Sequence, residues 1–104
     1  MAIVDVTIIP IGTKGASVSD YVANMQNFLE ENKEKYKITY QLTPMNTLIE
    51  GELDDLFSVV RAMHELPFLK GIDRVATNIR IDDRRDKRAT LESKMESVHK
   101  KIHQ

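Results

Sequence analysis

The stretch KITYQLTPMNTLIEGE, residues 37–52, contains two short alternating segments and lies between two longer helical patterns. Apolar and polar residues alternate along residues 38–42, which is the period of a β-strand. A Thr-Pro pair at positions 43–44 interrupts this strand, and a second short strand then runs through Ile49. A strand pair with a helix on either side indicates two strand-helix-strand units joined in the middle of the chain.

The outer segments supply the remaining strands. Residues 3–9 are rich in β-branched side chains that alternate with polar ones, so they predict a strand, which Pro10 and Gly12 are expected to end. Residues 74–82 alternate in the same way and predict a fourth strand. The expected order is therefore strand, helix, strand, strand, helix, strand and a final helix.

Three helical patterns complete this order. The first follows Ser17 and Asp20, which resemble a capping box, and it is expected to end at about Asn32. The second is expected to begin at Gly51, after which acidic residues favour a helix start, and to be limited by Pro67. The apolar rows of the three helices are Val18, Val22, Met25 and Leu29; Leu53, Leu56, Phe57, Val60 and Met63; and Leu91, Met95, Val98 and Ile102. The third row is narrow and indicates a docking helix.

These elements predict an α+β fold of the ferredoxin-like kind, a split βαββαβ sandwich with an additional C-terminal helix. The first and third strands should be central, with the fourth beside the first. At 104 residues, with no linker or repeat, residues 1–104 are expected to form a single domain.

Composition excludes several classes of partner. Fifteen basic residues nearly balance sixteen acidic ones, so no overall field draws the chain to nucleic acid or to an anionic membrane. No apolar run approaches the roughly 20 residues that span a bilayer. Cysteine is absent, which excludes thiolate chemistry and fits a reducing compartment, so a cytoplasmic protein is expected.

One face of the predicted sheet has a mixed composition. If Val4, Val6 and Ile8 face the helices, the alternate residues of the first and fourth strands face away from them. These residues are Ile3, Asp5, Thr7, Ile9, Arg74, Ala76, Asn78 and Arg80. Apolar side chains beside charges indicate a surface that another subunit covers, so we expect a homo-oligomer in which the last helix is a second contact.

Glu50 is the first candidate for a binding residue, because a carboxylate at the end of a central strand is expected to be partly buried and must then have partners. The amides that follow Gly51 are a structural explanation for it. The functional alternative is an acceptor, or a donor if its pKa is raised, for a polar heterocycle. Spacing alone favours the structural role.

Asn46 and Thr47 precede Glu50 by four and three residues. Asn46 follows Pro44 at a position where a left-handed residue would be convenient, and turn chemistry is its expected role. Thr47 adds a small donor and acceptor, although alone it is an ordinary strand threonine.

Other polar groups predict less. The run IDDRRDKR, residues 81–88, mixes three acids with four bases, so salt bridges are expected there rather than a phosphate site at Arg84 or Arg85. His99 and His103 are four residues apart with no third ligand in sight, so no metal site is expected. No nucleophile-base signature, phosphate loop or dinucleotide turn occurs, and no catalytic residue is predicted.

Four segments together resemble a known family, the small thiamine-binding proteins of the YkoF type, long catalogued as a domain of unknown function. The resemblance is carried by VTIIPIGT (6–13), PMNTLIEGE (44–52), RVATNIRIDDRRD (74–86) and LESKMESVHKKI (91–102). These segments span nearly the whole chain in the same order as in the family.

The resemblance implies a ferredoxin-like fold, assembly into a dimer of dimers, and binding of thiamine or its hydroxymethylpyrimidine part as ligand, with no known reaction and no cofactor. It also implies a ligand-binding set on matching positions: Thr47, Glu50, Thr77 and Asn78, with Asn46 in the turn and Met45 as a soft apolar wall. An aminopyrimidine offers an amino donor beside ring-nitrogen acceptors, which a carboxylate and a hydroxyl or amide can match, and this moves the expectation for Glu50 toward ligand contact.

Two other functions remain as alternatives. Dimeric α+β barrel monooxygenases share this strand-helix order, although the chain has no tryptophan and no convergent His-Asn-Trp set. An oligomeric regulatory domain that binds no thiamine is the other. RNA binding through the sheet would need aromatic residues on the first and third strands, which have none.

Overall fold

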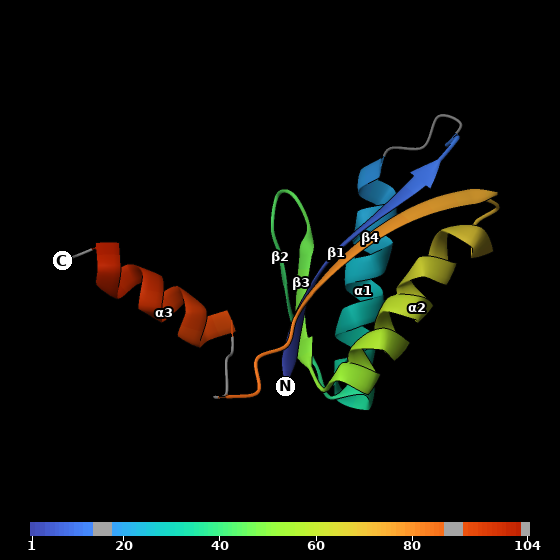
Figure 1. Ribbon diagram of the computed structural model, residues 1–104. Helices are drawn as coiled ribbons and strands as arrows, with labels where there is room; N and C mark the ends of the chain where they lie inside the picture. The colour runs from blue at the N-terminus through green and yellow to red at the C-terminus, as the bar shows by residue number, and fades with distance from the viewer. Residues whose placement is uncertain (14–17, 87–90, 103–104) are drawn as a thin grey trace.

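The computed structural model describes residues 1–13, 18–86 and 91–102 of the chain. Seven elements follow one another in the predicted order (Figure 1). They are β1 (Ala2–Ile11), α1 (Val18–Tyr36), β2 (Thr39–Leu42), β3 (Thr47–Gly51), α2 (Leu53–Leu69), β4 (Arg74–Asp82) and α3 (Leu91–Ile102).

The four strands form one antiparallel sheet in the order β2-β3-β1-β4. Helices α1 and α2 lie side by side against one face of this sheet, and α3 extends away from them (Figure 1). This is the ferredoxin-like arrangement, with β1 and β3 central and β4 beside β1, and it confirms the predicted fold class.

The core lies between the sheet and the two helices. Val4 and Ile49 contribute from the central strands, and Leu29, Leu56 and Met63 contribute from the helices, all with at most 2% of their surface exposed. Each such side chain stabilises the fold by roughly 1.5–3 kcal/mol through burial alone.

The two faces of the sheet follow the predicted alternation. Register places Val4 opposite both Ile49 and Ile81, so these side chains share the helix-covered face. Asp5 lies opposite Leu48 and Arg80 on the other face, which we call the open face. Neither α1 nor α2 covers the open face (Figure 1).

Strand β1 is longer than predicted, because it continues through Pro10 to Ile11 before Gly12, with φ of 79°, ends it. The expectation that Pro10 ends the strand is wrong. Pro10 lies opposite Val75 of β4, and at this point no strand among the described residues pairs with the other side of β1. A proline, which has no N–H, is tolerated in a strand where that side carries no ladder.

Helix α1 ends four residues later than the predicted Asn32. Lys33 and Lys35 lie in its last turn, where cations are favourable, and Tyr36 lies 6.3 Å from the ring of Phe28. Lys37 then adopts a left-handed φ of 55° and terminates the helix. The predicted capping residue, Ser17, lies outside the described residues.

Helix α2 differs from the prediction at both ends. Gly51 is the last residue of β3, and the N-cap is Glu52, so the helix begins at Leu53. Pro67 lies inside the last turn instead of ending the helix, which continues to Leu69. A single lost hydrogen bond is tolerated there because the turn is followed by bonds from the N–H groups of residues 70–72 to Pro67 and Phe68 carbonyls.

The apolar face of α2 is rotated slightly from the predicted one. Val59 is fully buried, whereas Phe57 is 52% exposed and lies on the flank toward β4. The predicted apolar row of residues 91–102 lies on helix α3, but the helix buries none of its residues and the row is largely exposed. Within the described part of the chain, no helix is long and apolar enough to cross a membrane.

Candidate functional site

A notch lies where β1 extends beyond the end of its pairing with β3, the other central strand. β1 pairs with β3 only as far as Val6 opposite Thr47, but it pairs with β4 as far as Ile11. The hollow that remains has a volume of about 230 Å³. We call it the notch; it is lined by residues 6–9 of β1, by Val18, Val22, Met25 and Gln26 of α1, and by residues 42–47 of the β2–β3 hairpin.

The walls of the notch are mainly apolar, and two of its polar side chains, Thr47 of β3 and Gln26 of α1, contact each other. Thr47 is the buried polar residue of the described chain, with 7% of its surface exposed. Its Oγ1 accepts a hydrogen bond of 3.1 Å from Nε2 of Gln26. The Thr47 hydroxyl proton and the Gln26 carbonyl oxygen therefore remain as a donor and an acceptor.

The backbone of β1 supplies further polar groups to the notch. From Thr7 onward the side of β1 that faces the hairpin pairs with no strand in the described structure. Half of the N–H and C=O groups of a strand point to each side, so residues 7–9 present unpaired backbone groups beside the hollow. A flat heterocycle with adjacent donor and acceptor atoms can bind such an edge as another strand would.

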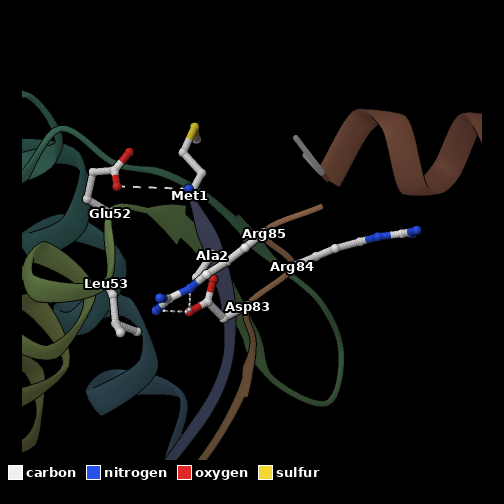
Figure 2. Close-up of a pocket in the computed structure, with 7 residues that line it drawn as sticks. All are labelled: Met1, Ala2, Glu52, Leu53, Asp83, Arg84 and Arg85. Carbon is white, nitrogen blue, oxygen red and sulfur yellow. Dashed lines mark hydrogen bonds and ion pairs between the residues drawn. The ribbon is translucent and has the colours of Figure 1, made fainter. Parts of the chain in front are cut away.

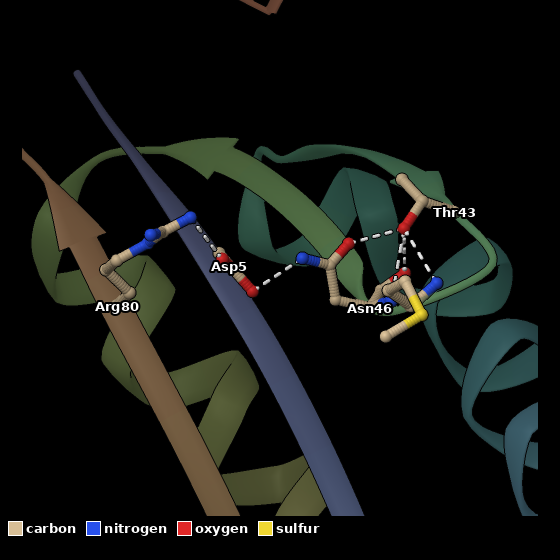
Figure 3. Close-up of polar contacts among 5 residues, drawn as sticks. Asp5, Thr43, Asn46 and Arg80 are labelled. Atoms are coloured by element: carbon tan, nitrogen blue, oxygen red, sulfur yellow. Dashed lines mark hydrogen bonds and ion pairs between the residues drawn. The ribbon is translucent and has the colours of Figure 1, made fainter.

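The hairpin loop that bears Met45 is held in place by a chain of hydrogen bonds (Figure 3). Asp5 Oδ1 accepts a bond of 2.7 Å from Asn46 Nδ2, and Asn46 Oδ1 accepts one of 2.5 Å from the Thr43 hydroxyl. Asp5 Oδ2 also pairs with Arg80 of β4 at 2.8 Å. The open face thus fixes the loop that forms the far wall of the notch.

Asn46 does not adopt the left-handed conformation that its position suggested. Its backbone N–H donates to the Thr43 hydroxyl at 3.1 Å, and its carbonyl accepts from the Thr43 N–H at 2.9 Å. The turn is closed by these side-chain bonds, so no positive φ is needed. Met45 lies at the tip of the loop with 82% of its surface exposed.

Glu50 lies away from the notch, on the open face. Its Oε1 accepts a bond of 2.5 Å from the Thr39 hydroxyl, and its Oε2 accepts one of 2.9 Å from the N–H of Leu91, the first residue of α3. The structural explanation from the sequence named the wrong helix, because the amide comes from α3 and not from the turn after Gly51. Since side chains alternate along a strand, Glu50 and Thr47 face opposite sides of the sheet.

Thr77 and Asn78 lie on β4, one strand beyond the notch. Thr77 faces the helices, and its Oγ1 lies 2.6 Å from Nδ1 of His64 on α2. Asn78 lies opposite Thr7 on the open face and is exposed. Of the six predicted ligand residues, the structure therefore brings together Met45, Asn46 and Thr47, and it places the other three outside the notch.

A larger hollow of about 620 Å³ lies at the other end of the sheet (Figure 2). Met1, Ala2, Glu52, Leu53, Asp83, Arg84 and Arg85 line it. Its charges are engaged in ion pairs: Arg85 pairs with Asp83 at 2.8 Å, Arg84 pairs with Asp86 at 2.6 Å, and the amine of Met1 lies 3.8 Å from Glu52. None of the predicted ligand residues lines this hollow, and its lining of paired charges is unsuited to an uncharged ring.

The charged turn after β4 forms the predicted salt bridges. Arg84 donates two hydrogen bonds to Asp86, at 2.6 and 2.9 Å, which raise the pKa of Arg84. The hydrogen bond from Arg85 lowers the pKa of Asp83 and raises that of Arg85. These residues lie at the surface, so the pairs add little to stability.

Sequence reasoning missed Gln26 as part of the site. Its signal is present, because Val18, Val22 and Gln26 follow one another at intervals of four and all three line the notch. A glutamine that continues an apolar row of a helix faces the same side as the apolar residues.

Among the described residues no group of three metal-ligating side chains occurs; His103 lies outside them.

Comparisons with known proteins identify the family. The family described as thiamine-binding protein matches residues 4–99 of the chain. The UPF0045 protein YqgV of Bacillus subtilis is 70% identical over 102 residues, which are 98% of each chain. A UPF0045 protein of Methanothermobacter thermautotrophicus is 43% identical over 98% of this chain and its own full length. The chain therefore belongs to the thiamine-binding protein family.

Solved structures show the same fold. The hypothetical protein MJ1052 of Methanocaldococcus jannaschii matches with a TM-score of 0.78 and 36% identity, over 94% of this chain and 95% of its own. A protein of Thermotoga maritima, assigned provisionally to thiamine biosynthesis or salvage, matches with a TM-score of 0.70 at 18% identity, over 93% of this chain and 97% of its own. At that identity the second likeness supports the fold alone.

Proposed function

We propose that the protein is a non-enzymatic small-molecule-binding protein that holds the aminopyrimidine part of thiamine, or free hydroxymethylpyrimidine, in the notch. The observation that carries this proposal is the early end of the β1–β3 pairing, which leaves a hollow with an apolar lining, an unpaired strand edge and the Thr47–Gln26 pair. Membership of the thiamine-binding family supports the ligand class.

Size and chemistry of the notch favour one ring over a whole cofactor. Its volume of about 230 Å³ lies below the roughly 300–1,000 Å³ typical of sites that enclose drug-sized ligands. The Thr47 hydroxyl and the Gln26 carbonyl can match the ring nitrogen and amino group of an aminopyrimidine. Apolar side chains of Val22 and Met25 can contact the ring faces.

The same groups are suited to binding without a reaction. Hydroxyl, amide and backbone groups do not titrate near neutral pH, so the notch has no acid or base with which to exchange a proton. We therefore propose storage or delivery of the ligand in the cytoplasm. Thiamine recovered intact after prolonged incubation with the protein is the expected result, and steady release of a product would contradict it.

Calorimetric titration tests the site with a matched pair of variants. Hydroxymethylpyrimidine and thiamine should bind, and the thiazole part alone should not. Thr47→Val should weaken binding about tenfold, because it removes one hydrogen bond. Thr77→Val makes the same chemical change on β4, outside the notch, and should leave the affinity unchanged.

The titration also separates the notch from the other predicted contacts. No binding of either ligand at millimolar concentration would overturn the proposed function. Binding that Glu50→Gln weakens and Thr47→Val does not would place the ligand at the far end of β3. Ligand contact by Glu50, Thr77 and Asn78 stays a prediction, and the Glu50→Gln and Thr77→Val variants test the first two of these residues.

We also propose a homo-oligomer, a dimer of dimers. Two exposed surfaces support it: the open face, where Ile9 and Ile11 are 44% and 38% exposed, and the apolar row of α3, where Met95, Val98 and Ile102 are 54%, 48% and 68% exposed. A closed tetramer with twofold symmetry needs more than one self-complementary surface on each subunit. Light scattering on the purified protein measures the assembly directly.

A further inference from the structure

The hairpin side chains that line the notch already have partners within the protein. The Thr43 hydroxyl donates to Oδ1 of Asn46 at 2.5 Å, and it accepts from the N–H groups of Met45 and Asn46 at 3.2 and 3.1 Å. Nδ2 of Asn46 donates to Asp5 at 2.7 Å. Thr43 and Asn46 are therefore occupied by the bonds that hold the loop, and a ligand in the notch must use other groups.

Gln26 and Thr47 are the two side chains with polar capacity to spare. Gln26 is half-buried on α1, and Thr47 is 7% exposed on β3. Thr7 contributes only backbone, because it lies opposite Asn78 and its side chain points to the open face. Recognition by side chains in the notch thus depends on a single pair.

The hydrogen bond inside this pair determines what each member presents to a ligand. Nε2 of Gln26 donates to Oγ1 of Thr47 at 3.1 Å. Thr47 accepts in this bond, so its own proton is available as a donor; Gln26 donates in it, so its carbonyl oxygen is available as an acceptor. The notch therefore presents one donor beside one acceptor, in a fixed order.

We propose that Gln26 is a specificity-determining residue that, through its bond to Thr47, makes the notch select aminopyrimidines and reject oxopyrimidines. The inference rests on the proposed function and extends it, because it states which rings the site excludes. An aminopyrimidine has an amino donor beside a ring nitrogen that accepts. When an oxo group replaces the amino group, the adjacent ring nitrogen carries a hydrogen, so the donor and the acceptor exchange places.

An oxopyrimidine in the same position opposes both members of the pair. Its oxygen faces the carbonyl oxygen of Gln26, and its ring N–H faces the hydroxyl proton of Thr47. A buried polar group that loses its partner costs about a factor of ten in affinity. Two such mismatches predict a preference of about a hundredfold for the amino form.

The amide of Gln26 has a second way to pair with Thr47. After half a turn its carbonyl oxygen would accept the Thr47 proton, and its NH₂ group would face the ligand. That arrangement presents the reverse pattern and would select oxopyrimidines. The structure has the first arrangement, in which Nε2 lies against Oγ1, so the amino form is the expected ligand.

The other groups around the notch do not distinguish the two forms of the ring. None of the described residues that line it is charged. The free edge of β1 presents both N–H and C=O groups, so it offers partners to either pattern. The choice between the two ligands therefore depends on Gln26 and Thr47.

Calorimetric titration with a pair of ligands tests this preference. Thiamine and oxythiamine, in which an oxo group replaces the amino group, carry the same charge and have nearly the same size. The parent chain should bind thiamine about a hundredfold more tightly. The ratio of the two dissociation constants is the measured quantity, because a variant whose notch is only distorted weakens both ligands together.

Substitutions at the pair should change this ratio. Gln26→Met removes the acceptor of the amino group and leaves the Thr47 hydroxyl able to turn, so the ratio should fall to within about threefold of one. Thr47→Ser retains the hydroxyl and should retain most of the preference, whereas Thr47→Val should lose it. Gln41→Met is the matched control: it makes the same chemical change on the exposed strand β2, outside the notch, and should leave the ratio at the parent value.

The outcomes separate this inference from the function on which it rests. Equal affinities for thiamine and oxythiamine, or a ratio that Gln26→Met leaves unchanged, would overturn the inference and leave the proposed function standing. Tighter binding of oxythiamine would overturn it by showing the reverse arrangement of the amide. Failure of both ligands to bind at millimolar concentration would overturn the proposed function and the inference together. Circular dichroism on each variant confirms that its fold is intact before the ratios are compared.

Discussion

The two ends of β3 differ more than their sequence suggests. At the hairpin end, the pairing of β3 with β1 stops at Thr47, and the part of β1 beyond this point borders a hollow. At the α2 end, Glu50 lies between Thr39 and Leu91, and Gly51 lies against Ile38. One end of a five-residue strand is left open, and the other is closed by contacts.

This difference shows where a small sheet can form a binding site. The position of Glu50 at a strand end made its carboxylate a candidate binding group in the sequence. In the structure both of its oxygens accept hydrogen bonds from the protein itself. A free strand edge arises instead where one central strand extends beyond the end of its central neighbour. The point at which their pairing stops depends on tertiary structure. The predictions below change one end at a time.

The largest effect is expected at the closed end, for Gly51→Val. A Cβ at this position would lie 3.0 Å from Cγ2 of Ile38 and 3.4 Å from the carbonyl oxygen of Lys37, and valine adds two more methyl groups. Such overpacking should lower the free energy of unfolding by about 2–3 kcal/mol, measured by urea denaturation.

Met45→Val is the control for that measurement at the open end. Met45 is 82% exposed, so the variant should change stability by no more than about 0.5 kcal/mol. Equal losses for the two variants would mean that both ends are packed alike, and the contrast would then fail.

The next effect concerns the bonds that hold the open end in shape. Asp5→Ala removes the acceptor of Asn46 and the partner of Arg80, and should lower the free energy of unfolding by about 1–3 kcal/mol. It should also weaken ligand binding, because the loop that carries Met45 loses its attachment to β1.

Arg80→Ala separates the two contributions. This side chain is 84% exposed, so its loss should cost less than about 1 kcal/mol and leave the bond between Asp5 and Asn46 in place. If Arg80→Ala weakens ligand binding as much as Asp5→Ala, the charge pair and not the loop attachment controls the notch.

Much of this fold follows from local pattern. The period of two predicts residues 74–82 as a strand and assigns its faces correctly, and the narrow apolar row of residues 91–102 predicts a helix there, which is α3. The errors occur where tertiary contacts override local signals. Pro10 stays within β1 because one side of that strand is free, and α1 continues because Tyr36 packs on Phe28.

The site was less predictable for the same reason. Thr47 and Thr77 are both strand threonines, yet Thr47 contacts Gln26 in the notch and Thr77 contacts His64 of α2. Which partner each one meets depends on strand order and on the point where pairing stops. Asn46 was correctly placed in a turn, but its long-range bond to Asp5, 41 residues away, has no local signature.

A smaller effect is expected at the closed end for Glu50→Ala. The variant removes the acceptor of the Leu91 N–H, the first amide of α3, and a lost helix cap costs about 1 kcal/mol. Hydrogen exchange should become faster at the start of α3 and stay unchanged in β1. Ligand affinity should also stay unchanged; a weaker affinity would show that the closed end takes part in binding.

The smallest effect on stability is expected for the hydrogen bond that joins β2, the outer strand of the hairpin, to α1. The Tyr40 hydroxyl donates to Glu30, which also accepts from Lys33. Hydrogen bonds from Lys33 and Tyr40 lower the pKa of Glu30 below its ordinary value of 4.5. Because the folded pKa is the lower one, this contribution to stability is complete above pH 4.5 and is lost as pH falls through the folded value.

Tyr40→Phe should therefore be slightly less stable than the parent chain at neutral pH and nearly equal to it in strong acid, by thermal denaturation at both pH values. The hydrogen bond to Glu30 also raises the pKa of Tyr40 above its ordinary 10.0, so one of the three tyrosines should ionise late in an alkaline titration, and the variant should lack that late step. A stability difference that persists in acid would mean that Tyr40 acts through packing rather than through its hydrogen bond to Glu30. Packing contacts would then stabilise β2, as they do the closed end of β3.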